Sequence, residues 1–182
     1  MLILIVLLIL FRARGDIFRN AASDLWISIL FLAFIPVAAY PLQPVLPKYK
    51  DKGREGQRNL ALLFSLLGYV CALLFGLFFH VTSELFLIYC SYILSILALL
   101  FFNKIIKFRS SGHMCAVTGP LILLVYFVGW AALIPCLLLF VLVWWASLST
   151  KRHTFPELLG GFLSCVVAYL ASLAVVSLMR IQ

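Results

Sequence analysis

The sequence has few charged residues, and most of those are basic. Only 11% of its 182 residues are charged, with six Asp and Glu against fourteen Lys and Arg, which gives a formal net charge of +8. Hydrophobic residues make up 65% of the chain and the mean hydropathy is +1.18, values well outside those of soluble domains. The composition excludes a soluble globular enzyme and predicts an integral membrane protein.

Paired cysteines are also missing. The five cysteines stand singly in or beside apolar runs, their total is odd, and no C-x-x-C motif occurs. Such spacing offers neither a zinc site nor a disulfide framework. We interpret these cysteines as small packing residues between helices, and we expect neither a metal site nor a cofactor.

Long apolar runs without period-two alternation predict membrane-spanning helices and exclude a β-barrel. The run over about 114–147 is too long for one span of roughly 20 residues, so we divide it near Gly129. The expected spans are about 24–44, 59–79, 84–103, 114–128, 130–147 and 158–179. The predicted fold is an all-α polytopic transmembrane bundle of about six spans and a short N-terminal apolar segment, forming one domain over 1–182.

Two segments near the start of the chain need their own interpretation. Met1–Phe11 is apolar but too short to cross a bilayer, so it is a signal-type hydrophobic region, a half-helix or the stub of a longer terminus. Asp24 is expected to cap the first full span, and Pro36 and Pro41 are expected to bend or end it.

Basic residues collect in three polar segments, at about 48–58, 104–113 and 147–157. Because two spans separate each segment from the next, all three are expected on the same face of the membrane. Basic residues at the ends of apolar runs meet anionic lipid before nucleic acid. We therefore expect the membrane and a lipid-borne phosphate as partners, and no nucleic acid.

Residue types suited to phosphoryl transfer occur in these segments. Guanidinium groups bind phosphate oxygens bidentately, a Ser-Gly pair brings a hydroxyl and a backbone N–H to an oxyanion, and two imidazoles can share nucleophilic and acid/base roles. His153 and Glu157 are spaced i, i+4, so the carboxylate can accept a proton from the imidazole Nδ1. The candidate residues are Lys52, Arg58, Ser111, Gly112, His113, Arg152, His153 and Glu157.

At these positions the sequence resembles the type 2 phosphatidic acid phosphatase superfamily, whose motifs run K-x6-R-P, P-S-G-H and S-R-x5-H-x3-D. The run 110–113 reads S-S-G-H, with Ser in place of Pro. The run 146–157 keeps the spacing of the third motif, with Ala-Ser for Ser-Arg and Glu for Asp. The first motif, around 51–59, keeps Arg58 but loses its Pro, and Lys52 or Lys50 has to supply its Lys.

The resemblance implies a metal-independent phosphatase acting on a lipid phosphate or an isoprenyl diphosphate. It implies that His153 forms a phosphohistidine, that Glu157 orients His153, and that His113 protonates the leaving oxygen. The phosphate oxygens are then held by Lys52, Arg58, Ser111 and the Gly112 N–H, and either Arg152 or Lys151 is a candidate to replace the Arg missing at Ser147.

Two other functions stay open at this point. Because Lys, Pro and Arg are each lost from a motif, the chain is alternatively a lipid-phosphate-binding or scaffold relative without catalysis. A small transporter subunit is the other alternative, but no span carries a charged residue at its middle and no inverted repeat is visible.

Two signals give opposite orientations for the site. Ten basic residues lie on the face of the polar segments against four on the other, which by the positive-inside rule places the site in the cytoplasm. If five of the ten are set aside as candidate phosphate contacts, five basic residues remain on this face against four on the other, and the count no longer favours either orientation. The ten are Lys48, Lys50, Lys52, Arg54, Arg58, Lys104, Lys107, Arg109, Lys151 and Arg152, and the five set aside are Lys52, Arg54, Arg58, Lys151 and Arg152. The cluster Arg12–Arg19 then favours an extracytoplasmic site.

Overall fold

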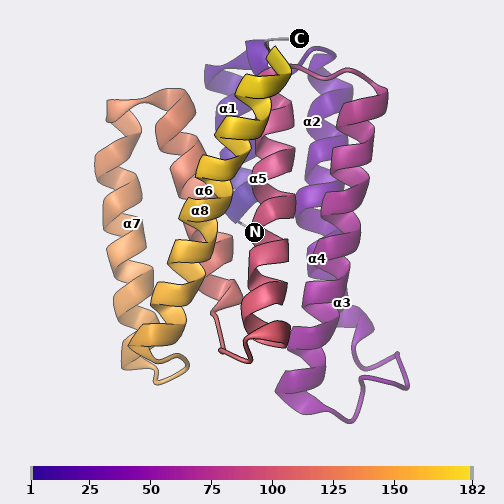
Figure 1. Cartoon of the computed structure of the whole chain (residues 1–182), viewed down its shortest axis with the longest axis vertical. Coiled ribbons are helices and arrows are strands. Elements are labelled where there is room, and N and C mark those ends of the chain that lie inside the picture. Colours follow the sequence, from indigo (N-terminus) through magenta and orange to yellow (C-terminus); the bar gives the residue numbers. More distant parts are fainter. Residues whose placement is uncertain (1, 181–182) are drawn as a thin grey trace.

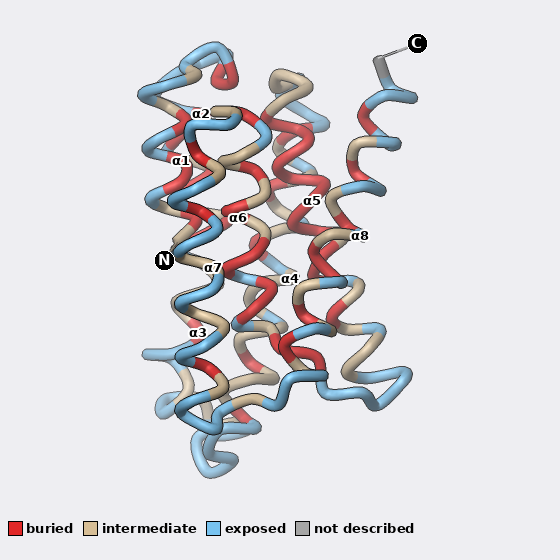
Figure 2. The backbone as a smooth tube through the Cα atoms, turned by 90° about the vertical axis from the view of Figure 1, so that its left-hand side faces the viewer, coloured by how far each residue is buried: buried red, intermediate tan, exposed pale blue. Residues whose placement is uncertain are grey.

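The computed structural model describes residues 2–180, with side chains up to Met179, and these residues form a bundle of helices running along one axis (Figure 1). No strand occurs in this part of the chain. In order, the helices are α1 (Leu2–Ala13), η1 (Gly15–Ile17), α2 (Ala21–Ile29), η2 (Leu30–Phe34), α3 (Ile35–Leu42), α4 (Gly53–Phe78), α5 (Ser83–Leu100), η3 (Phe101–Ile105), α6 (Gly112–Val128), α7 (Trp130–Ser149) and α8 (Phe155–Arg180). Helix α5 lies between α4 and α8 and is the most buried of the long helices (Figure 2).

Five helices are long and apolar enough to cross a membrane: Ala21–Leu42, Gly53–Phe78, Ser83–Ile105, Trp130–Ser149 and Phe155–Met179. Large apolar side chains point outward from them, with Phe78 75% exposed and Leu138 66% exposed. Outward apolar surface of this kind suits lipid. The predicted all-α membrane fold is confirmed, but the sixth expected span, α6, has only 17 residues and is shorter than the other five.

The first long span begins earlier than the sequence predicts. Helix α2 starts at Ala21 with Asn20 as its N-cap residue, so Asp24 is not the cap. Instead, the Asp24 Oδ2 accepts a hydrogen bond of 2.9 Å from the Asn20 backbone N–H. The carboxylate thus reaches back to the helix start from within the first turns, where an acidic group is favoured by the helix dipole.

The prolines of this span lie where the helix tolerates them. Pro36 lies in the first turn of α3, directly after the π-helical turn η2, and the span ends at Leu42, one residue after Pro41. A proline has no N–H to donate, a loss that a helix tolerates in its first turn. The predicted end of the span close to Pro41 is confirmed.

Helix α4 extends into the first polar segment. The sequence predicts a loop over 48–58, but α4 begins at Gly53, so 53–58 are helical. Gln43 ties this start to the preceding loop, because its Nε2 donates a 2.7 Å hydrogen bond to the Gly53 carbonyl. The change matters for the site because Arg54 and Arg58 now lie one helical turn apart on the same helix.

The short N-terminal segment belongs to the core. Ile3, Val6, Leu7 and Leu10 are buried where α1 packs against α2 and α6 (Figure 2). Further along, α6 and α7 are separate helices that meet at Gly129, whose φ of 84° is a conformation that glycine adopts readily. The predicted division of the 114–147 run near Gly129 is confirmed.

Candidate functional site

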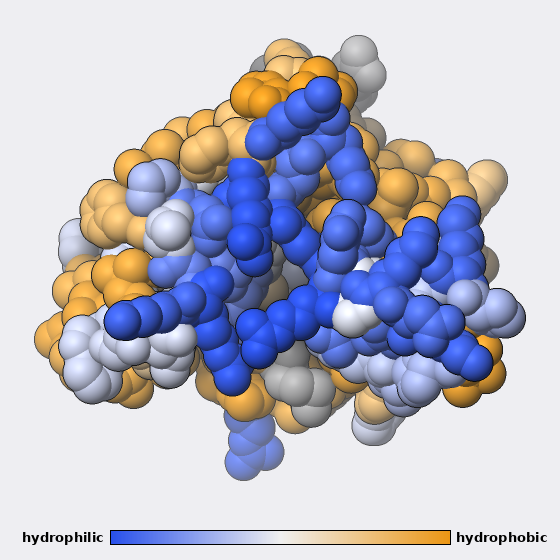
Figure 3. Space-filling model, turned by 90° about the horizontal axis from the view of Figure 1, so that it is seen from below, coloured by the Kyte–Doolittle hydropathy of each residue, from blue (hydrophilic) through white to orange (hydrophobic). Residues whose placement is uncertain are grey.

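The three polar loops lie at the same end of the bundle, at the bottom of Figure 1. They cover 43–52 between α3 and α4, 106–111 between η3 and α6, and 150–154 between α7 and α8. Seen from this end, hydrophilic side chains spread across the face and surround a hollow near its centre (Figure 3). The predicted same-face arrangement of the polar segments is confirmed.

A cavity of about 1280 Å³ begins at this face and continues between the helices. Its polar mouth includes Arg54, Arg58, His113, Arg152 and His153. Its deeper wall is formed mainly by apolar and hydroxyl-bearing side chains of α1, η2 and the helices from α3 to α8. A charged mouth above an apolar interior is the shape that an amphipathic ligand requires.

His153 and Glu157 form a pair across the start of α8. The His153 Nδ1 lies 3.2 Å from the Glu157 Oε2, as the i, i+4 spacing predicts. The same carboxylate oxygen accepts the Thr154 N–H at 3.2 Å, and Arg109 Nε lies 3.5 Å from the other oxygen. Because Glu157 contacts Nδ1, the other ring nitrogen of His153, Nε2, remains available to a ligand.

Arg58 is held in place by the neighbouring helix and loop. Its Nη2 donates to the Asn103 Oδ1 and, at 3.1 Å, to the Ser110 carbonyl. Asn103 also accepts the Ser110 N–H at 3.1 Å and donates from Nδ2 to the Leu99 carbonyl at 2.8 Å. Asn103 lies in the π-helical turn η3 and connects α4 with the loop that leads to α6.

Ser111 is buried behind the cavity wall, whereas Gly112 forms part of that wall. The buried Ser111 caps α6, because its Oγ accepts the Met114 N–H at 3.2 Å, and its own N–H donates to the Glu157 carbonyl at 2.9 Å. Its side chain is not part of the cavity wall, whereas Gly112 is. A Cβ added to Gly112 would meet no atom within 4 Å, so its backbone adjoins open space.

His113 follows on the first turn of α6, outside the five long apolar spans. Burial lowers the pKa of His113 below the usual value of histidine, and the nearby His153 and Arg152 lower it further. A lowered pKa favours the neutral imidazole, which accepts a proton at one nitrogen and donates from the other.

The sequence-based set of site residues is only partly gathered around the cavity. Arg58, Gly112, His113, Arg152 and His153 line it, and Glu157 contacts His153. Lys52 is exposed at the N-cap position of α4 and is not part of the cavity wall.

Several polar lining residues were not predicted as site residues, among them Gln57, Asn103 and Arg109. Arg54, one of the candidate phosphate contacts named above, also lines the cavity, and it lies one turn from Arg58 because α4 begins at Gly53. Arg109 was counted above as a basic residue of this face but not as a candidate phosphate contact. No sequence signal marks Asn103, because its orientation depends on the π turn that contains it.

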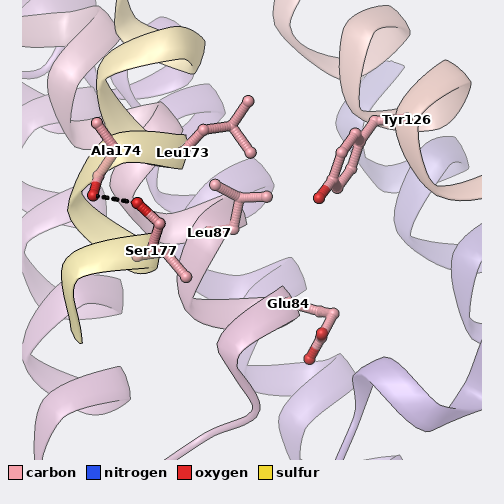
Figure 4. Close-up of a pocket in the computed structure, with 7 residues that line it drawn as sticks. Glu84, Leu87, Tyr126, Leu173, Ala174 and Ser177 are labelled. Carbon is pink, nitrogen blue, oxygen red and sulfur yellow. Dashed lines mark hydrogen bonds between the residues drawn. The ribbon is translucent and has the colours of Figure 1, made fainter. Parts of the chain in front are cut away.

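A smaller cavity of about 350 Å³ lies toward the other end of the bundle. Figure 4 shows Glu84 and Leu87 of α5, Tyr126 of α6, and Leu173 and Ser177 of α8 around it. Among the described residues, neither Lys nor Arg lines this cavity. Within the described residues a phosphate group therefore has no cationic partner in this wall, in contrast to the large cavity.

Within residues 2–180, no three His, Cys, Asp or Glu side chains come together as a metal-binding group. No protein-family model matches the chain, and no curated protein or solved structure is significantly similar to it.

Proposed function

We propose that this protein is a metal-independent phosphatase of membrane lipids, acting on a lipid phosphate or an isoprenyl diphosphate through a phosphohistidine. The observation that carries the proposal is the shared cavity of His113, His153 and Arg58, which continues from a polar mouth between apolar helices. A head group fits the mouth, and its hydrocarbon tail extends between the helices or into the bilayer. The resemblance to the type 2 phosphatidic acid phosphatases supports the same reaction.

In the proposed reaction His153 is the nucleophile. Glu157 accepts a hydrogen bond from the Nδ1–H across 3.2 Å, which leaves the Nε2 lone pair free to attack phosphorus. A P–N bond forms as the P–O bond to the leaving group breaks, and His113, which enters this step as the imidazolium, donates a proton to the departing oxygen and becomes the neutral imidazole that its lowered pKa favours. A water molecule then gives its proton to His113 and attacks phosphorus, which breaks the P–N bond and releases phosphate.

Arginines neutralise the phosphate charge in this proposal. Arg58 and Arg152 line the cavity with the two histidines, and Arg54 and Arg109 extend the positive wall. Guanidinium groups stabilise the charge of a transferring phosphoryl group without proton exchange. Arg109 is also the best replacement for the Arg that the third motif lacks at Ser147, because it contacts Glu157 and lines the cavity.

A binding or scaffold protein is the second candidate function, and Ser147 is the observation that favours it. Ser147 lines the cavity, but its hydroxyl donates to the Val143 carbonyl at 2.7 Å within α7. It therefore does not replace the donor capacity of an arginine. Such a relative would hold a lipid phosphate among the remaining arginines and release nothing.

Phosphate release by the purified protein distinguishes the two candidates. The panel contains phosphatidate, phosphatidylglycerophosphate and a polyprenyl diphosphate, each with and without a chelator. We expect release that the chelator does not change and that His153→Ala lowers by orders of magnitude. His80→Ala is the matched control, because His80 is exposed in the turn between α4 and α5 at the other end.

Two results would contradict the phosphatase proposal. Binding of the same lipids without phosphate release would establish the scaffold function instead. Near wild-type release by His153→Ala would remove the phosphohistidine from the mechanism.

A further inference from the structure

Two cysteines from different helices are in contact below the polar mouth of the large cavity. The Cys115 Sγ on α6 lies 3.1 Å from the Cys165 Sγ on α8, and the Cys165 Sγ also lies 3.2 Å from the Cys115 carbonyl oxygen. Both residues are only 5% exposed, yet both line the cavity. Fifty residues separate them in the sequence.

Glycines on either side of the pair hold α6 and α8 close together. A Cβ atom added to Gly119 would lie 3.3 Å from the Cys165 Sγ. On the other side, Gly161 of α8 packs so tightly against Ser111 that an added Cβ would overlap the serine carbonyl. The approach of the two thiols therefore follows from helix packing on both sides and not from a side-chain rotamer alone.

We propose that Cys115 and Cys165 form a reversible disulfide that links α6 to α8. A disulfide has an S–S bond of about 2.05 Å, so the two sulfur atoms have to approach by only about 1 Å. The proposal is independent of the phosphatase reaction, since it concerns sulfur chemistry alone.

The oxidation balances with a peroxide as the oxidant. One thiolate attacks a peroxide oxygen and becomes a sulfenic acid, with the second oxygen leaving as water after it takes up protons. The other thiol then attacks the sulfenyl sulfur and expels a second water as the S–S bond forms. The two thiols lose two electrons and two protons together, and the peroxide is reduced to water.

The other cysteines provide natural controls. Within the described residues, Cys71, Cys90 and Cys136 have no sulfur partner. Cys136 is buried on α7 and Cys90 on α5, so burial alone does not distinguish the pair. Cys115 and Cys165 differ from the other cysteines in the contact between their thiols.

The link would lie directly behind the candidate site. Cys115 follows His113 by two residues on α6, and Cys165 follows Glu157 by eight on α8. At about 1.5 Å per residue, the disulfide lies within roughly 12 Å of both along the helices. It would fix the spacing of the two helices that carry these groups.

Peptide mapping of the intact, detergent-solubilised protein tests the proposal. In a Cys136→Ser background, trypsin cleavage after Arg109, Lys151 and Arg152 gives peptide 110–151 with Cys115 alone and peptide 153–180 with Cys165 alone. After peroxide treatment and alkylation of the remaining thiols, we expect the two peptides to appear joined, lighter than their sum by two hydrogen atoms. A reductant should separate them again.

The variants decide the assignment. Cys165→Ser should abolish the joined product, and Cys90→Ser should leave it unchanged. Separate alkylation of Cys115 and Cys165 after both peroxide and diamide treatment would overturn the proposal, and so would a link from Cys165 to Cys71 or Cys90. Each of these results is measured by mass spectrometry of the peptides and does not depend on phosphate release.

Discussion

Gly161 of α8 lies directly against Ser111 at the start of α6, so that a Cβ atom on the glycine would overlap the serine carbonyl oxygen. This close approach allows the Ser111 N–H to donate to the Glu157 carbonyl at 2.9 Å. The loop that carries the candidate phosphate contacts is thereby joined to the helix that carries Glu157.

Gly161→Ala should therefore destabilise the protein. Overpacking against backbone costs about 1–3 kcal/mol, because the carbonyl cannot move aside as a flexible side chain does. Thermal unfolding in detergent, followed by circular dichroism, should show a lower midpoint. Gly112→Ala is the matched control with no atom within 4 Å of the new Cβ; equal midpoints for the two variants would contradict the packing argument.

Arg58 and Lys52 should differ sharply in their effect on activity. Arg58→Lys loses the guanidinium group, whose Nη2 donates to both Asn103 and the Ser110 carbonyl. We expect kcat/KM for phosphate release to fall at least about tenfold, equivalent to about 1.4 kcal/mol. Lys52→Ala should stay within about twofold of wild type, since Lys52 does not line the cavity. A larger loss at Lys52 than at Arg58 would reverse this assignment of the first motif.

Two buried tyrosines of α5 should respond differently to the loss of their hydroxyl groups. The Tyr89 hydroxyl lies 2.7 Å from the Ser28 Oγ, whereas within residues 2–180 the Tyr92 hydroxyl has no hydrogen-bond partner. Tyr89→Phe should lower the free energy of unfolding by about 1 kcal/mol, and Tyr92→Phe should lower it by less or raise it. Denaturant titration of both variants makes the comparison, and a greater loss for Tyr92→Phe would show that its hydroxyl is bonded.

The stability of the protein should depend on pH through His113. Its pKa is lowered in the folded state, so between that value and the usual value of about 6.5 the unfolded chain binds more protons than the folded protein. Stability therefore rises with pH through this window. On acidification from pH 7.5 we expect the unfolding midpoint to fall, and the loss to be complete below the folded pKa.

His113→Asn tests the assignment because it removes the titrating ring. The unfolding midpoint of this variant should change less between pH 7.5 and 5.5 than that of wild type, and His80→Asn serves as the control at the other end. An equal pH dependence in wild type and His113→Asn would assign the effect to other groups.

The site is expected to face the extracytoplasmic side. Asp51→Cys and Ala22→Cys, each in a protein without its native cysteines, place exposed thiols at opposite ends of the bundle. Asp51 is preferable to the neighbouring Gly53, whose φ of 49° disfavours a side chain. A membrane-impermeant maleimide should label Asp51→Cys in intact cells and Ala22→Cys only after lysis. The opposite pattern would place the site in the cytoplasm.

The sequence predicts the helical membrane fold because it depends on long apolar runs and their breaks. Gly129 divides two helices as expected, since its neighbours are too apolar for a loop and too numerous for one span. The bond between His153 and Glu157 also follows from local spacing alone. Local patterns of this kind can be recognised from the sequence alone.

Contacts that depend on packing between helices could not be predicted in this way. Cys115 and Cys165 appear isolated in the sequence because helix pairing, not spacing, brings their sulfur atoms together. Asp24 appeared to be a cap because it precedes an apolar run, but the three residues before it are also helical. Lys52 was expected in the site because the first motif needs a Lys, but it is exposed at the N-cap position of α4 and does not line the cavity.

Asn103 would affect the entropy of ligand binding at the proposed site. Its side chain joins Arg58, the Leu99 carbonyl and the Ser110 N–H before any ligand arrives. The conformational entropy of ordering this loop and the arginine is therefore lost during folding, not when a phosphate binds. A ligand that enters the mouth meets groups already held in one arrangement, so more of its interaction energy remains available as affinity.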